Sequence, residues 1–341
     1  MRVFWDEAQR AHDPVFFMLR GVIGTNYEVA ARADALLAAC RGMALEIVQP
    51  PAPLMSAILD VHTSDLIAFL RDAHTLWSAV PGVGPELVPN HHITPEMAAN
   101  GGRRPDHILG QLGYYTGDTS MPIGPGSWDA ALASAGCAIA AAGEAAAGRH
   151  AYALCRPPGH HAYAGRASGH CMLNNAAIAA EALRRRGAAR VGILDLDCHH
   201  GNGTQGIFWE RDDVVTVSVH GDPNNCYPWF VGHPGERGMG AGAGCNLNLP
   251  LQRGADDAAW VGATQAGLRR LEDCDALVIA LGQDASVHEP LGFLAVTEEG
   301  FARAGAVVGA VGKPCAIVQE GGYDVERIGT LLVRFLMGLG E

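Results

Sequence analysis

The chain is poor in basic residues for its size. Its 24 Lys and Arg stand against 36 Asp and Glu, so the formal net charge is −12. A strongly acidic chain is a poor partner for nucleic acid or for an anionic membrane, and we expect it to bind neither. The same charge would attract a small cationic substrate.

The sequence also lacks paired cysteines and long apolar runs. Its nine cysteines are scattered, and none forms a Cys-x-x-Cys pair. Several fall in apolar segments, where reduced cysteine behaves as a small hydrophobe, which favours a reducing compartment. The amino terminus has no apolar signal-peptide core, and no stretch approaches the ~20 apolar residues of a membrane span. We therefore expect a cytoplasmic protein.

What the sequence does contain is the pattern of one large α/β domain over residues 1–341. Hydrophobic residues make up 48% of the chain, and we find neither internal repeats nor low-complexity segments. Apolar strands are expected at 151–155, 191–196, 214–219, 247–249, 276–281 and 316–318. Helices are expected at 128–147, 174–186, 256–271 and 298–311, with a last one ending near 337. This alternation predicts a mostly parallel sheet with helices on both faces.

The first third of the chain follows no such alternation. Thr25-x-x-Glu28 has the pattern of a capping box and predicts a helix that runs to about Cys40. A second helix is expected after His62. Residues 80–127 are rich in Pro and Gly and too long for a plain connection, which is typical of a functional or interface loop.

Polar side chains follow five of the predicted strands. They lie at 156–161, 197–200, 220–223, 282–284 and 320–323. Because the carboxyl ends of parallel strands meet at one edge of a sheet, and ligands bind at that edge, these side chains predict a functional site.

Three of these side chains have the donor types of a metal site. Asp197, His199 and Asp284 would supply three N/O ligands and leave a fourth position open, as in a catalytic rather than a structural zinc site. The same donors also suit Fe(II), Co(II) or Mn(II). A lone Asp such as Asp284 could equally cap a helix or a turn after Gly282.

Acid–base groups lie close to these ligands in the sequence. His160 and His161 follow a stiff Pro-Pro-Gly turn, and a histidine can serve as a base near neutral pH without special tuning. Asp195 and Asn202 are candidate partners: a charged partner would favour an imidazolium, and a neutral amide would leave its imidazole free as base. Tyr323 follows two glycines and could donate its phenolic proton to a developing oxyanion.

Together these motifs resemble the signatures of the zinc-dependent histone deacetylase superfamily, which has the arginase-like α/β fold. The matching stretches are Arg156-Pro157-Pro158-Gly159-His160-His161, residues 195–205 and Glu320-Gly321-Gly322-Tyr323. The resemblance implies zinc on Asp197, His199 and Asp284, His161 as general base and acid, His160 as its electrostatic partner, and Tyr323 as carbonyl polariser. It also implies a structural potassium ion near Asp195, Asp197, His199, Ser218 and Val219, and a second monovalent site near Phe208, Arg211 and Val214.

Two further stretches, 110–115 (Gly-Gln-Leu-Gly-Tyr-Tyr) and 220–223 (His-Gly-Asp-Pro), look like the bacterial acetylpolyamine amidohydrolase branch. This implies an acetylated small cationic amine as substrate, and a homodimer in which the 80–127 insertion narrows the pocket mouth. Leu109 and Ser120 stand where that branch places carboxylates. The substrate-binding candidates are Tyr227, His170, Gly169, Leu291, Asp106 and Asp118.

Other functions fit the sequence less well. A deacetylase of acetyl-lysine in proteins or peptides needs an open mouth; the long insertion argues against one, whereas the uncharged Leu291 keeps this alternative open. An arginase-like ureohydrolase with two manganese ions needs more carboxylates. A binding protein would be expected to have lost a ligand, the histidine pair or the tyrosine. The glycine-rich stretch 238–244 follows no apolar strand, so dinucleotide binding is disfavoured.

Overall fold

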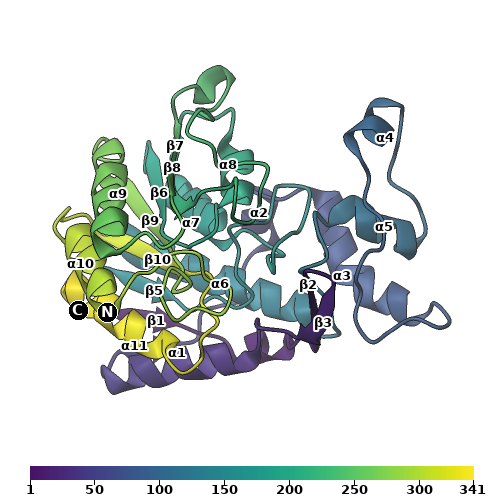
Figure 1. Ribbon diagram of the computed structural model, residues 1–341, viewed down its shortest axis with the longest axis horizontal. Coiled ribbons are helices and arrows are strands. Elements are labelled where there is room, and N and C mark those ends of the chain that lie inside the picture. Colours follow the sequence, from purple (N-terminus) through teal and green to yellow (C-terminus); the bar gives the residue numbers. More distant parts are fainter.

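An eight-stranded sheet runs through the middle of the protein, whose computed structural model describes residues 1–341 (Figure 1). The strand order is β4-β1-β5-β10-β9-β6-β7-β8, and every neighbouring pair is parallel. The strands are β1 (Arg2–Phe4), β4 (Glu46–Val48), β5 (Ala151–Ala153), β6 (Val191–Asp195), β7 (Val214–Gly221), β8 (Asn246–Leu251), β9 (Ala276–Leu281) and β10 (Cys315–Gln319). The predicted α/β class with a parallel sheet is confirmed.

Helices cover both faces of this sheet, as predicted. One face packs against α3 (Ser64–Ser78), α5 (Ile108–Tyr115), α6 (Ser127–Ala146) and α7 (Asn175–Arg185) in a core of 43 buried residues. The other packs against α1 (Ala30–Gly42), α9 (Asp257–Arg270), α10 (Glu298–Gly309) and α11 (Ile328–Leu339) in a core of 38. In β6, Val191 and Ile193 enter the first core and Leu194 the second. Burial on both faces explains why the central strands are continuous apolar runs.

The amino-terminal region differs from the prediction. Thr25 is the last residue of β3 (Val22–Thr25), which pairs with β2 (Phe16–Leu19) in a separate antiparallel hairpin. Helix α1 begins only at Ala30, after Val29, whose side chain makes no capping bond. The capping-box prediction is therefore wrong, because Glu28 turns into the protein and pairs with Arg32 instead of folding back on a cap.

The 80–127 segment, which the sequence analysis took to be a functional or interface loop, contains regular secondary structure. It contains α4 (Pro95–Ala99) and α5, and an antiparallel bridge between Leu87 and Ile123 closes it. Tyr115 of α5 stacks on Phe69 of α3 with ring centroids 4.8 Å apart, so the segment is anchored to the domain. Figure 1 shows α4 and α5 standing out to one side of the sheet.

Four short helices complete the chain: η1 (Glu7–Ala11), α2 (Met55–Leu59), α8 (Asn202–Phe208) and η2 (Gly240–Gly242). None of the helices combines the length and the apolar composition that crossing a membrane requires.

Candidate active site and metal centre

The five strands that end in polar residues are consecutive in the sheet, in the order β5-β10-β9-β6-β7. Their carboxyl ends therefore meet at one edge, as expected. Strand β6 has β7, the next strand in the chain, on one side and β9 on the other. Chain connections diverge between β6 and β9, and in open α/β sheets such a switch point opens a crevice for a ligand.

The three candidate metal ligands come from the two sides of this crevice. Asp197 and His199 follow β6, and Asp284 follows β9; their ligand atoms all lie within 4.8 Å of one another. His199 Nδ1 is 2.9 Å from Asp284 Oδ2 and 3.2 Å from Asp197 Oδ1. Both carboxylates are fully buried.

The surroundings of the two carboxylates fit a divalent cation. Burial, and then the charge of Asp197, raise the pKa of Asp284 to about 6, which shows that two negative groups are crowded here. A Cβ added at Gly282 would lie 2.2 Å from Asp197 Oδ2, and one at Gly321 would lie 2.4 Å from Asp284 Oδ2. Glycine is therefore needed at both positions to let the backbone approach the carboxylates. Two carboxylates and an imidazole are the donors of a catalytic zinc-type site.

The histidine pair has the two kinds of partner that the sequence left open. His160 Nδ1 is 2.9 Å from Asp195 Oδ2, and His161 Nδ1 is 2.6 Å from Asn202 Oδ1. Burial opposes the charge on His160, but Asp197 and Asp195 outweigh it and raise its pKa to about 10. Burial and the neighbouring His160 hold the pKa of His161 well below its usual value. His160 is thus the charged member of the pair and His161 the neutral one.

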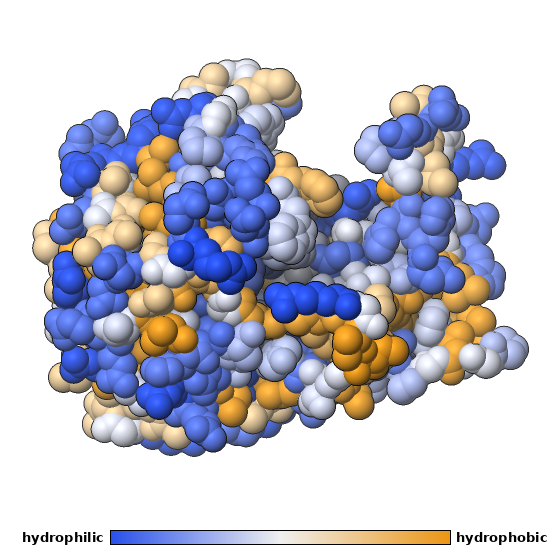
Figure 2. Space-filling view, viewed as in Figure 1, coloured by the Kyte–Doolittle hydropathy of each residue, from blue (hydrophilic) through white to orange (hydrophobic).

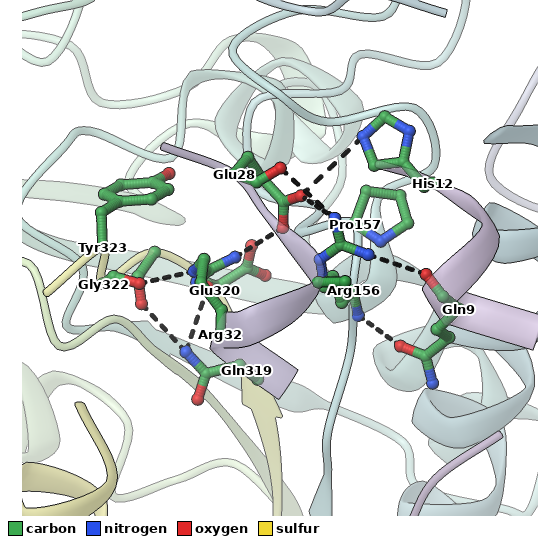
Figure 3. Close-up of polar contacts among 12 residues, drawn as sticks. Gln9, His12, Glu28, Arg32, Arg156, Pro157, Gln319, Glu320, Gly322 and Tyr323 are labelled. Carbon is green, nitrogen blue, oxygen red and sulfur yellow. Dashed lines mark hydrogen bonds and ion pairs between the residues drawn. The ribbon is translucent and has the colours of Figure 1, made fainter. Parts of the chain in front are cut away.

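Tyr323 is held by a buried arginine that the sequence analysis did not identify (Figure 3). The guanidinium carbon of Arg32 lies 4.7 Å from the centroid of the Tyr323 ring. Arg32 Nε donates to the carbonyl oxygen of Gly322 at 2.5 Å, and Nη2 donates to that of Glu320 at 2.7 Å. Burial raises the pKa of the Tyr323 phenol well above its usual value, so the phenol keeps its proton.

Arg32 belongs to a buried ionic cluster centred on Glu28. Glu28 Oε1 accepts from Arg32 Nη1 at 2.6 Å, and Glu28 Oε2 is 2.9 Å from Arg156 Nη2. Arg156 also donates to the backbone oxygen of Gln9 at 2.8 Å (Figure 3). The i, i+4 spacing of Glu28 and Arg32 was the sequence signal for this cluster. The capping-box prediction had instead paired Glu28 with Thr25.

A cavity of about 360 Å³ leads to this centre. His161, His199 and Tyr323 line it, and so do four predicted substrate-binding residues: Gly169, His170, Tyr227 and Leu291. The sequence analysis missed the remaining walls, among them Phe17, Arg20, Trp229, Arg253 and Phe293. These residues lie far apart in the sequence and carry no shared motif.

The two carboxylates expected near the substrate are not among the lining residues. Asp118 lies behind the wall, where it accepts hydrogen bonds from Tyr227 Oη at 2.5 Å and from Ser168 Oγ at 3.0 Å. Asp106 accepts from the Gln111 side chain through its backbone oxygen. Within a single chain, neither carboxylate faces the cavity.

Gly169 allows one wall to approach the histidine pair. It has φ +54°, and a Cβ there would lie 2.4 Å from His161 Cδ2 and 2.8 Å from Tyr227 Oη. The next residue, His170, also has a positive φ and packs its ring 5.7 Å from that of Tyr323. Burial lowers the pKa of His170 to about 4, so this part of the wall is uncharged at neutral pH.

The residues expected around monovalent ions also lie near one another. Asp195 and Ser218 are partners in the β6–β7 register and both line a small cavity of about 10 Å³. In the second set, the Arg211 guanidinium lies 5.1 Å from the centroid of the Phe208 ring, and Val214 begins β7. Binding of potassium at the first place and of a monovalent ion at the second stays a prediction.

Comparisons with known proteins identify the family. A family model described as a histone deacetylase domain matches residues 26–339, and the chain belongs to that family. Within it, the chain is similar to proteins named as acetylpolyamine amidohydrolases. It is 42% identical to one from Burkholderia pseudomallei, with 100% of this chain and 99% of that protein covered. It is 39% identical to acetylpolyamine amidohydrolase 2 of Pseudomonas aeruginosa, with 99% and 98% covered.

The fold comparison agrees. A crystal structure of acetylpolyamine aminohydrolase from Burkholderia pseudomallei superimposes with a TM-score of 0.95 at 41% identity, covering 100% of this chain and 98% of that one.

Proposed function

We propose that the protein is a metal-dependent amide hydrolase that removes acetyl groups from small amines such as acetylated polyamines. Membership of the histone deacetylase family and the names of its relatives support deacetylase activity. The observation that carries the proposal is the convergence on one cavity of three metal-ligand side chains, a histidine pair with unlike partners, and a tyrosine.

The ligand set would hold the metal ion: zinc, or Fe(II), Co(II) or Mn(II). Bound by Asp197, His199 and Asp284, such an ion would acidify a water molecule and polarise the amide carbonyl. Three ligands would leave a further coordination position for water or substrate. His199 lines the cavity wall and both aspartates are buried, so a bound ion would be reached from the cavity.

His161 is placed to act as the general base. Its Nδ1 donates to Asn202, so Nε2 is unprotonated and accepts the proton of the attacking water. The same nitrogen then delivers that proton to the leaving amine, and the C–N bond breaks. His160, charged beside Asp195, stabilises the negative charge that develops and lowers the proton affinity of its neighbour.

Tyr323 completes the site as a hydrogen-bond donor. Its hydroxyl has no partner within the chain, and its raised pKa keeps it protonated. It can therefore donate to the carbonyl oxygen as that atom becomes an oxyanion.

A substrate panel tests the proposal. We expect the zinc-loaded protein to release acetate from acetylputrescine and acetylcadaverine faster than from an acetyl-lysine peptide of random sequence, because the 80–127 segment of a second subunit would narrow the mouth of the cavity. A peptide that is turned over tenfold faster or more would favour the protein-deacetylase alternative. No turnover of any acetamide, with metal bound, would refute amide hydrolysis.

We also propose that the protein is a homodimer through the 80–127 segment. Met97 and Leu109 are large apolar residues exposed on this projecting segment, at 43% and 47% of their surface. Sedimentation equilibrium should give twice the chain mass of 35.8 kDa, and a monomer at micromolar concentration would refute the assembly.

A further inference from the structure

The end of the 80–127 segment is joined to a loop that forms part of the cavity wall. Figure 2 shows the projecting α4–α5 region standing apart from the rest of the surface across a hollow. Beyond α5 the chain returns to the domain, where Thr116 and Ala167 form a parallel bridge. Gly117 donates to the carbonyl oxygen of Ala167 at 2.8 Å, and Ala167 donates to that of Tyr115 at 2.8 Å. The segment therefore reaches the wall within a single chain.

Asp118 follows this bridge, and its carboxylate accepts hydrogen bonds from two parts of the wall. Its Oδ2 accepts from Tyr227 Oη at 2.5 Å and from Ser168 Oγ at 3.0 Å. The backbone nitrogen of Gly169 donates to the same oxygen at 3.1 Å. Oδ1 accepts from the backbone nitrogen of Ser120 at 2.8 Å. One carboxylate thus joins its own segment to both wall loops, through hydrogen bonds that its charge strengthens.

The two wall loops lie where a small movement would change the width of the cavity. Gly169 and His170 have consecutive positive φ angles of +54° and +67°, a conformation that costs energy for a residue with a side chain and needs support from its surroundings. The ring of Tyr227 lies 5.0 Å from that of His161 and 6.0 Å from that of His199. Without the bonds to Asp118, the cavity could therefore widen beside the candidate metal centre.

From these contacts we infer that Asp118 is a positioning residue that fixes the width of the cavity beside the metal centre, so that the site selects unbranched acetylated amines. The inference rests on the proposed function and specifies the shape of its substrate. Asp118 acts through Tyr227 and Gly169, which line the cavity, and takes no part in bond cleavage.

Two substrates that differ only in width test the inference: N-acetylputrescine and its analogue with a methyl group on the second carbon from the amide nitrogen. Both carry one distal ammonium, so the charge of the mouth, including any that a second subunit adds, cancels in the ratio of their kcat/KM values. A surplus methyl group in a close-fitting cavity costs about 10- to 200-fold, and we expect the wild type to prefer the unbranched substrate by a ratio in this range. Asp118→Ala should reduce that ratio by roughly tenfold, because a wall that is free to move can yield to the methyl group.

A double-variant cycle tests whether Tyr227 carries the effect. Tyr227→Phe keeps the ring, removes the hydroxyl donor and should also reduce the ratio. Combining it with Asp118→Ala should reduce the ratio no further than Asp118→Ala alone, because both changes break the same hydrogen bond. Asp118→Asn keeps one acceptor oxygen and should retain part of the ratio. As a control, Asp129→Ala removes an exposed carboxylate from the first turn of α6, outside the cavity, and should keep the ratio of the wild type.

The ratio separates positioning from support of the fold. Lost stability alone would lower kcat/KM for both substrates in proportion, so an unchanged ratio in Asp118→Ala would overturn the inference; if that variant does not fold, an unchanged ratio in Tyr227→Phe would do so. Independent effects of the two substitutions, or a wild type that does not distinguish the two substrates, would also overturn it. Failure of the metal-loaded wild type to hydrolyse either substrate would instead refute the proposed function.

Discussion

Replacing Arg32 by lysine tests how the tyrosine of the site is held. Lysine keeps the positive charge beside Glu28 but has one nitrogen where arginine uses three. The carbonyl oxygen of Glu320 would still accept from Gln319 Nε2 at 3.0 Å, whereas that of Gly322 has no other side-chain donor. The substitution therefore leaves one buried acceptor unsatisfied.

The structure sets the size of the expected effect. An unsatisfied buried acceptor costs about 1–3 kcal/mol. Because Glu28 stays paired with Arg156, no buried charge is left alone, and the loss of stability should remain within this range. At roughly 2–4 °C per kcal/mol for a domain of medium size, Tm should fall by about 2–12 °C. Tyr323 also loses its cation–π contact and the rigid backbone before it, so kcat should fall on the order of 10- to 100-fold.

Calorimetry, initial rates and metal content would be measured on Arg32→Lys and on Arg41→Lys, an exposed control on the same helix. We expect kcat to fall with KM and metal content little changed, and the control to match the wild type. A variant with lower Tm but normal kcat would show that Arg32 supports the fold and not Tyr323. Normal values of both would refute the reasoning altogether.

Four further predictions concern the site and its supports. Asp284→Ala should lose the divalent ion and all activity; metal content by elemental analysis equal to that of the wild type would remove Asp284 from the ligand set. Tyr323→Phe should keep metal and Tm but lose kcat on the order of 10²- to 10³-fold, as other oxyanion donors do, and near-normal turnover would exclude it from the mechanism. Gly169→Ala places a Cβ 2.4 Å from the ring of His161 and should lower both Tm and kcat, whereas Gly165→Ala, whose nearest contact is 3.5 Å, should be tolerated; equal behaviour of the two variants would contradict this. Burial would raise the pKa of Glu28, but two guanidiniums outweigh it and lower the pKa below 4.5, so its stabilisation is present above pH 4.5 and is lost as the pH falls through the lower folded-state value. The difference in unfolding free energy between wild type and Glu28→Gln should accordingly shrink on acidification, and a difference that is constant down to pH 3 would argue against the pairing.

Much of the fold was predictable because the central strands are buried on both faces. Continuous apolar runs such as those of β6 and β9 are recognisable as buried strands from the sequence alone. The polar residues that follow these strands were expected to lie together at one edge of the sheet. Asp197, His199 and Asp284 followed from this reasoning. The outer strands β1 and β4 have three residues each, too few to show any periodicity, and only pairing with neighbouring strands defines them.

The hairpin of β2 and β3 was missed for a related reason. Its turn is Arg20-Gly21 and not one of the pairs with Asn or Asp that mark such turns, and β3 is exposed along its whole length. The spacing of Thr25 and Glu28 is that of a capping box and therefore predicted a helix start at Thr25. In the folded protein Glu28 instead forms buried ion pairs with Arg32 and Arg156, and the capping box does not form.

By itself, then, the sequence determined which chemical groups follow which strands, and hence the fold class, the candidate metal ligands and the candidate acid–base residues. Only the tertiary structure decided that Asp195 partners His160 and Asn202 partners His161, that Arg32 supports Tyr323, and that Asp118 binds Tyr227 from behind the cavity wall. The physical reason is range: backbone preferences and burial periodicity act over a few neighbouring residues. The partner of a side chain, and therefore its charge state, depends instead on groups that folding brings within about 3 Å from positions 35 to 290 residues away.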